Sequence, residues 1–147
     1  MIRVARWILG AVFIYLGLIK ALHPVDFLKV VRQYDVFENH IALNLIAAVL
    51  PWFEVFCGLL LVAGIAVRGS ALALLALLFP FSAMVFRRAW LLHQEQAIPF
   101  CAVRFDCGCG TGEVLICGKL LENVLLALLT LVVLAGYRRI RAAQPPA

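Results

Sequence analysis

Four cysteines lie close together in one stretch of the chain, and thiols in such a group can exchange disulfides, crosslink a loop or bind a soft metal. The four are Cys101, Cys107, Cys109 and Cys117. Zinc sites usually separate paired cysteines by about two to four residues, whereas the gaps here are five, one and seven residues. The spacing therefore favours disulfide chemistry, and no metal site is expected.

Cys107 and Cys109 are the candidate working pair. A bridge between them needs Cα atoms within ~7 Å, and Gly108 eases the tight turn because glycine tolerates unusual backbone dihedrals. So short a ring is expected to be strained, and strained, exposed disulfides exchange readily. Cys101 and Cys117 then form either a second pair that relays electrons or a staple for the loop. The sequence does not choose among the three pairings, nor against a purely structural role for all four cysteines.

Ionisable residues within the apolar segments form a second candidate site, because charged groups inside a membrane are functional candidates by default. Glu54 lies one helical turn from Cys57. If Pro51 begins its helix, Glu54 lies near the outer surface, at a depth similar to those of Lys20 and Arg87. A buried charge cluster beneath the cysteines is therefore expected. Its two interpretations are a proton-handling or quinone-headgroup site, and an ion pair that locks helices together.

The elements that position these groups are predicted to be transmembrane helices. Of 147 residues, 65% are hydrophobic and only 14% are charged, and the mean hydropathy of +1.04 is typical of a membrane protein. A span needs about 20 mostly apolar residues. Four stretches qualify, at about 4–22, 51–67, 70–88 and 119–137. The predicted fold is all-α: one membrane domain, 1–147, built as a bundle of four transmembrane helices.

Two features lie outside the spans. Pro51 interrupts a long apolar region, so either a helix kinks there or residues 41–50 form a separate interfacial piece; Trp52 favours the second option because tryptophan collects at bilayer boundaries. Residues 25–38 alternate apolar and polar positions at helical spacing, which predicts a short helix on the membrane surface. Residues 93–118 are predicted to be a cysteine-containing outer loop.

The orientation follows from the distribution of positive charge. Short flanks without acidic residues hold the arginines on the side of the termini, and such flanks usually face the cytoplasm. Those arginines are Arg3, Arg6, Arg68, Arg138, Arg139 and Arg141. We expect cytoplasmic termini and a cysteine loop on the oxidising side. The net charge of +5 is ordinary for such a protein, and a nucleic-acid partner is not expected.

The order of a set of residues resembles the MauE/DoxX family of small four-helix bacterial membrane proteins, over roughly residues 10–135. The set comprises Gly17, Lys20, Pro24, Phe27, Val30, Tyr34, Pro51, Glu54, Gly58, Arg87, the motif DCGCG and Asn123. The resemblance implies that Cys107 and Cys109 are the thiols of the family's Cys-x-Cys motif and that Glu54 is its membrane glutamate. One departure is that Cys109 is followed by Gly110, Thr111 and Gly112, whereas the family commonly continues with an aromatic residue.

The resemblance also implies a function. MauE-like proteins are associated with disulfide formation in a secreted dehydrogenase subunit of methylamine utilisation, and DoxX-like proteins with quinone-coupled sulfur oxidation. We therefore expect a thiol–disulfide oxidoreductase or maturation factor of the bacterial inner membrane. A periplasmic substrate or thioredoxin-like partner would meet the four loop cysteines, and a quinone would bind at Lys20, Glu54 and Arg87. The alternatives are a non-enzymatic scaffold or subunit of a redox complex, and a protein that handles a soft metal.

Overall fold

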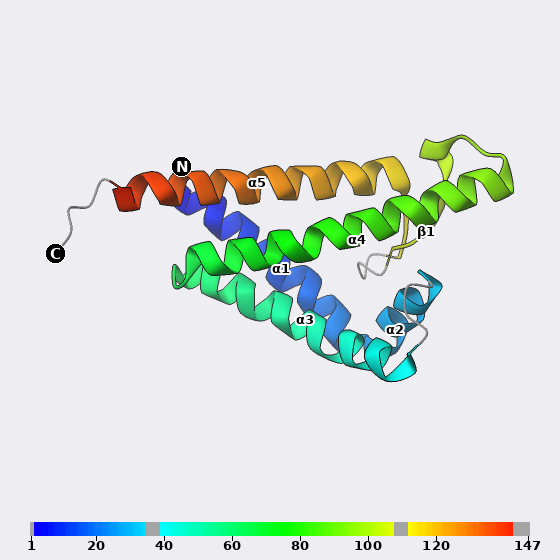
Figure 1. The fold of residues 1–147 in the computed structure, drawn as a ribbon, viewed down its shortest axis with the longest axis horizontal. Coiled ribbons are helices and arrows are strands. Elements are labelled where there is room, and N and C mark those ends of the chain that lie inside the picture. The colour runs from blue at the N-terminus through cyan, green and yellow to red at the C-terminus, as the bar shows by residue number, and fades with distance from the viewer. Residues whose placement is uncertain (1, 35–38, 108–111, 143–147) are drawn as a thin grey trace.

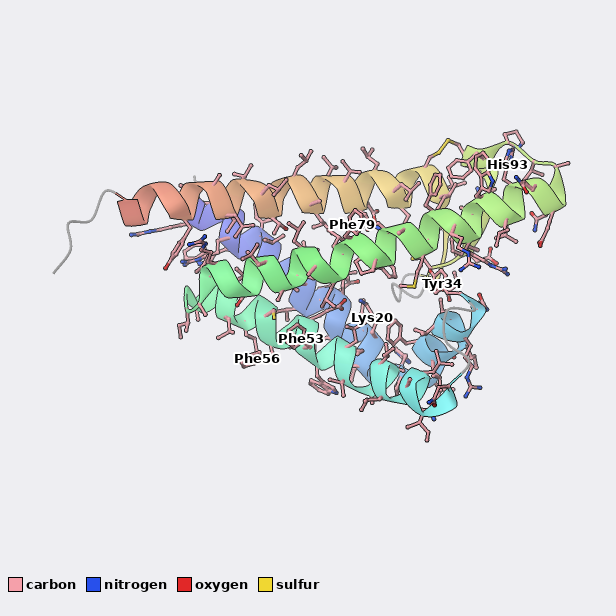
Figure 2. The ribbon with its side chains drawn as sticks, viewed as in Figure 1. Lys20, Tyr34, Phe53, Phe56, Phe79 and His93 are labelled. Carbon is pink, nitrogen blue, oxygen red and sulfur yellow. A yellow bond between two sulfur atoms is a disulfide. The ribbon has the colours of Figure 1, made fainter. Side chains whose placement is uncertain are left out.

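The computed structural model describes residues 2–34, 39–107 and 112–142. Within these ranges, the helices long and apolar enough to cross a membrane are four: Ile2–Leu22, Ile41–Ala63, Val67–Gln96 and Ile116–Tyr137. Large apolar side chains such as Phe53, Phe56 and Phe79 are exposed, and Figure 2 shows Phe56 pointing away from the bundle. Lipid rather than water suits such a surface. The predicted fold, an all-α integral membrane bundle with a cysteine-containing outer loop, is confirmed.

The elements follow the predicted order but differ in their bounds. They are α1 (Ile2–Leu22), α2 (Pro24–Gln33), α3 (His40–Ala63), α4 (Val67–Gln96), the short 3-10 helix η1 (Phe100–Ala102), β1 (Arg104–Asp106), β2 (Glu113–Leu115) and α5 (Ile116–Ala142). The start of α1 and the end of α5 lie at one end of the bundle, whereas α2 and β1 lie at the other (Figure 1). The four spanning helices cross the membrane an even number of times, so the first span begins and the last span ends on the same side.

Helices α1 and α3 pack unusually closely because glycines face one another. A Cβ atom added to Gly58 would lie 2.8 Å from the carbonyl oxygen of Gly10, and one added to Gly17 would lie 2.8 Å from the carbonyl oxygen of Pro51. Both distances are too short for a side chain, so the backbones approach as small residues in membrane helices allow. This contact brings Lys20 of α1 level with Glu54 of α3.

The prediction that residues 41–50 form a separate interfacial piece and that a span starts at Pro51 is wrong. Helix α3 starts at His40 and runs through Pro51 without a break. Its true start signal is Asn39, whose side-chain oxygen accepts hydrogen bonds from the backbone N–H groups of Ile41 and Ala42. Proline removes one backbone hydrogen bond, but neighbouring helices allow membrane helices to tolerate it, and Pro51 is buried. Trp52 is exposed in mid-helix rather than at the helix start.

We call the end of the bundle that carries α2 and β1 the outer end. It is more ordered than the predicted loop of residues 93–118. Helix α4 continues past its predicted end at residue 88 to Gln96, and α5 starts at Ile116 instead of 119. Between them, β1 and β2 form an antiparallel hairpin in which Phe105 pairs with Val114. The surface helix α2 covers Pro24–Gln33, within the predicted range 25–38 apart from its first residue. Residues 35–38 lie outside the described ranges.

Candidate functional site

A disulfide joins the start of the outer segment to the last transmembrane helix. Cys101 of η1 and Cys117 of α5 are bonded, with their Cα atoms 5.1 Å apart. The sequence left this pairing open. Cys101 is exposed and Cys117 is partly buried, so one sulfur of the bridge lies on a residue that faces the surroundings. The bridge also ties η1 to the first turn of α5, as a staple would.

Cys107 has a different environment. It is disulfide-bonded, fully buried, and belongs to an apolar cluster at the outer end that includes Tyr34, Val85 and Ile116. The exposed working disulfide expected here is therefore not found at Cys107, because the hairpin folds this residue inward against α2 and α4. Cys109 lies within residues 108–111, outside the described part of the chain.

Tyr34 fixes the position of Cys107. Its hydroxyl donates a hydrogen bond to the backbone carbonyl oxygen of Cys107, at 3.0 Å. Burial raises the pKa of Tyr34 well above its usual range, and the negative charge of Asp106 raises it further, while Arg88 acts in the opposite direction. Tyr34 therefore stays protonated and remains a hydrogen-bond donor. Apart from the place of Tyr34 in the family resemblance, no local pattern of residues predicts this contact.

Lys20 and Glu54, two of the three residues expected in a buried charge cluster, form a buried ion pair. Their side chains are 8% and 9% exposed, and the ammonium nitrogen of Lys20 lies 2.5 Å from a carboxylate oxygen of Glu54. The same nitrogen lies 5.6 Å from the ring centre of Phe27 and 5.9 Å from that of Phe81, so two aromatic faces add to its stabilisation. Lys20 projects from α1 into the space between α1, α3 and α4 (Figure 2).

Arg87 does not join this pair. It is exposed on α4 and is not among the residues that line the pocket beside Lys20 and Glu54, whereas Lys119 and Asn123 of α5 line it. Lys119 donates a hydrogen bond to Glu122 at 3.0 Å, and Asn123 donates one to the hydroxyl oxygen of Ser82 at 3.0 Å. The i, i+4 spacing of Lys119 and Asn123 at the start of an apolar helix was the available signal.

The pocket beside the ion pair is small, with a volume of about 30 Å³, enough for roughly one or two water molecules. A second pocket on the outer side of Lys20 is also lined by His23, Asp26 and Asp106. Lys20 therefore contacts both the Glu54 pocket and a space that reaches the residue directly before Cys107. This arrangement could connect the hairpin to the membrane interior by proton transfer.

A larger groove adjoins the inner pocket. It has a volume of about 530 Å³ and lies between α1 and α5, within the ~300–1,000 Å³ typical of small-molecule sites. Leu16, Lys119 and Leu126 line both the groove and the inner pocket. Tyr15 and Glu122 add polar groups to a groove that is otherwise mostly apolar. An amphipathic molecule from the membrane could therefore enter here and reach the buried polar groups.

No group of three or more histidine, cysteine or acidic residues able to hold a metal is found within the described ranges. Cys57 carries a free thiol and is buried in α3. It packs in the other apolar cluster, with Leu9, Phe13 and Leu61. Its neighbours there are apolar, so we assign it to packing.

Comparison with known families identifies the bundle. The profile of the family described as methylamine utilisation protein MauE matches residues 1–136. The chain belongs to the MauE family. No curated protein and no solved structure matches it significantly. The MauE resemblance noted in the sequence is thus confirmed over nearly the whole chain, and membership makes this a multi-pass membrane protein of a methylamine utilisation family.

Proposed function

We propose that this MauE protein is a membrane thiol–disulfide oxidoreductase that forms disulfides in a periplasmic protein of methylamine utilisation. The observation that carries the proposal is the gathering of disulfide-bonded cysteines at one end of the bundle. Cys101 and Cys117 are bonded to each other, Cys57 is free, and Cys107 is disulfide-bonded. Cys109 lies outside the described residues; as the second thiol of the family's Cys-x-Cys motif, it is the partner that we propose for Cys107.

A quinone is the proposed electron acceptor. When bound, it would accept two electrons and two protons as a protein dithiol becomes a disulfide. The residues suited to hold it are Lys20, Glu54, Lys119 and Asn123, which place hydrogen-bonding groups at the inner end of an apolar groove. Lys20 and Glu54 would hold or pass protons there. Arg87 is exposed, which supports replacing it in this set by Lys119.

The proposed setting is the bacterial inner membrane, with cytoplasmic termini and a periplasmic hairpin. Arg3 and Arg6 lie in the first turns of α1 and Arg68 is the second residue of α4. Both helices begin at the end of the bundle opposite to the hairpin (Figure 1), and short basic flanks favour the cytoplasm. The periplasm is an oxidising compartment in which protein disulfides form and persist. The substrate would be a periplasmic protein or a thioredoxin-like partner that carries its electrons.

The test is replacement of Cys107 or Cys109 by serine in the producing bacterium. We expect free thiols to accumulate in the secreted dehydrogenase subunit, measured by alkylation and mass spectrometry after a short pulse of synthesis. Cys57→Ser, which removes the buried free thiol, is the matched control and should leave the rate unchanged. Normal partner oxidation in both variants would disprove the proposal.

A non-enzymatic scaffold or subunit of a redox complex is the second candidate, and burial favours it. Cys107 is fully buried, and the Cys101–Cys117 bridge ties η1 to α5, as purely structural crosslinks would. This alternative predicts that all loop thiols stay oxidised under every growth condition. It also predicts that no mixed disulfide with another protein can be trapped by acid quenching.

A further inference from the structure

We propose that partner thiols enter at the Cys101–Cys117 disulfide, with the sulfur of Cys101 as the atom attacked. This inference rests on the proposed oxidoreductase function and assigns the order in which its cysteines act. Its basis is a contrast in exposure: Cys101 is exposed and Cys117 is partly buried, whereas Cys107 has no exposed surface at all. A protein thiolate must approach along the S–S axis, so a folded partner can reach the sulfur of Cys101 and not the buried sulfur of Cys107.

The local structure holds Cys101 outward on an ordered turn. Cys101 lies within η1, where the N–H of Ala102 donates to the carbonyl oxygen of Pro99 at 2.8 Å. The preceding residue, Phe100, is held by rings of α4, with ring centres 5.7 Å from Phe86 and 6.3 Å from Trp90. A partner thiolate would therefore attack a cysteine that is held in place beside the last turns of α4. Figure 2 labels His93 in this part of α4.

The other half of the bridge is suited to leave. Cys117 is the second residue of α5, a helix of 27 residues. Unpaired N–H groups and the aligned peptide dipoles at a helix N-terminus stabilise negative charge. A sulfur leaves faster when its thiolate is better stabilised. Attack on Cys101, which releases Cys117, is therefore favoured over the reverse direction for electrostatic as well as steric reasons.

A partner thiolate bonds to the sulfur of Cys101, the Cys101–Cys117 bond breaks, and Cys117 leaves as a thiolate. The partner's second thiol loses its proton and attacks the mixed disulfide, so the partner gains a disulfide and Cys101 is released. Two electrons now reside in the Cys101 and Cys117 thiols. Cys117 packs against the cluster that contains Cys107. Its thiolate would attack the sulfur of Cys107 and release that cysteine's partner as a thiolate; Cys101 would then attack the Cys107–Cys117 bond, so the Cys101–Cys117 disulfide re-forms and the two electrons lie in the second thiol pair. A quinone, when bound, would accept these two electrons together with two protons.

The experiment uses the full, oxidised chain in lipid nanodiscs and a short synthetic peptide that carries one cysteine. With a single thiol, the peptide forms a mixed disulfide but cannot resolve it. After a brief incubation, free thiols are alkylated and the adducts are mapped by mass spectrometry. We expect the peptide on Cys101 and the alkylating group on Cys117. A first adduct on Cys117, Cys107 or Cys109 would contradict the assignment.

A variant separates the entry role from a structural one. In Cys101→Ser/Cys117→Ser, we expect loss of oxidation of a two-cysteine peptide in quinone-containing nanodiscs, with Cys57→Ser as the control. If the bridge is only a staple, the double variant will unfold at a lower temperature yet oxidise the peptide normally, and the inference fails. A first adduct on Cys107 or Cys109 would disprove this inference but not the proposed function. The absence of adducts on every cysteine defeats the proposed function as well.

Discussion

At the scale of single residues, the Lys20–Glu54 pair raises the question of whether a buried ion pair acts in chemistry or only locks helices. Removing one partner of such a pair typically costs about 3–5 kcal/mol, because the other charge is left buried, whereas replacing both by apolar residues is often neutral. We predict that Glu54→Gln strongly destabilises the protein and that Lys20→Met/Glu54→Leu recovers most of the loss. Thermal unfolding in detergent micelles measures both effects.

The double variant then answers the question. If Lys20 and Glu54 hold protons or a quinone headgroup, the recovered protein should be stable but unable to pass electrons to a quinone, measured by quinone absorbance. A double variant that is both stable and fully active would reduce the pair to a helix lock. The pair lies beside Lys119, so Lys119→Met tests the neighbouring cation separately and should weaken quinone binding while leaving the ion pair intact.

Tyr34 carries a pH-dependent contribution to stability. Its pKa is raised in the folded protein, chiefly by burial, so folding favours the protonated phenol. The contribution is fully present below the ordinary pKa of 10.0 and is lost as pH rises above that value, because the unfolded tyrosine ionises first. We predict that Tyr34→Phe lowers stability by about 0.5–1.5 kcal/mol at neutral pH through the lost hydrogen bond.

The same variant should lose part of the alkaline decline in stability. Urea unfolding below and above pH 10 measures this difference between wild type and Tyr34→Phe. An identical alkaline decline in wild type and Tyr34→Phe would contradict the argument.

At the scale of elements, the contact between α1 and α3 depends on glycine. A methyl group at residue 58 would lie 2.8 Å from the carbonyl oxygen of Gly10 and 2.8 Å from a side-chain carbon of Ile14. Overpacking of this kind costs about 1–3 kcal/mol, so we predict that Gly58→Ala lowers the unfolding temperature. Gly69→Ala is the control: no atom lies within 4 Å of the added group, and alanine favours a helix. Equal unfolding temperatures for the two variants would contradict this account.

The depth of residues in the membrane could be predicted from the sequence, but the direction they face around a helix could not. Hydropathy located four spans, although the second begins at residue 41 rather than 51, and it placed Lys20 and Glu54 at a similar depth. Arg87 has a suitable depth but an exposed position, because helix rotation is set by packing partners that a single sequence does not reveal. The path of α3 through Pro51 was missed for a similar reason, since neighbouring helices compensate for proline.

The outer segment was the least predictable part. The cysteine spacing indicated disulfides, but the pairing of Cys101 with Cys117 depends on η1 meeting the start of α5. The burial of Cys107 depends on Tyr34 and on residues of α4, which are distant from it in sequence. Three-residue strands such as β1 and β2 are too short to leave an alternating pattern. Long-range contacts therefore determined what local spacing left open.

At the scale of the whole molecule, the two ends of the bundle differ in charge and in chemistry, and this difference predicts the orientation. Arg68 is exposed near the start of α4, and Gln94 is exposed near its end, so one helix provides a probe for each side. Short basic flanks favour the cytoplasm. We predict that Gln94→Cys, and not Arg68→Cys, reacts with a membrane-impermeant maleimide in cells with a permeabilised outer membrane.

Each variant also carries Cys57→Ser to remove the free thiol, and lysed cells provide the control in which both sites react. Labelling of Arg68→Cys alone in unlysed cells would reverse the orientation. The cysteines would then lie in the reducing cytoplasm, where stable disulfides are rare, and the exchange chemistry proposed for Cys101 would lose its oxidising compartment. Labelling of Gln94→Cys alone would place the Cys101–Cys117 disulfide in the periplasm, where secreted proteins acquire their disulfides, because Cys101 lies just beyond the end of α4.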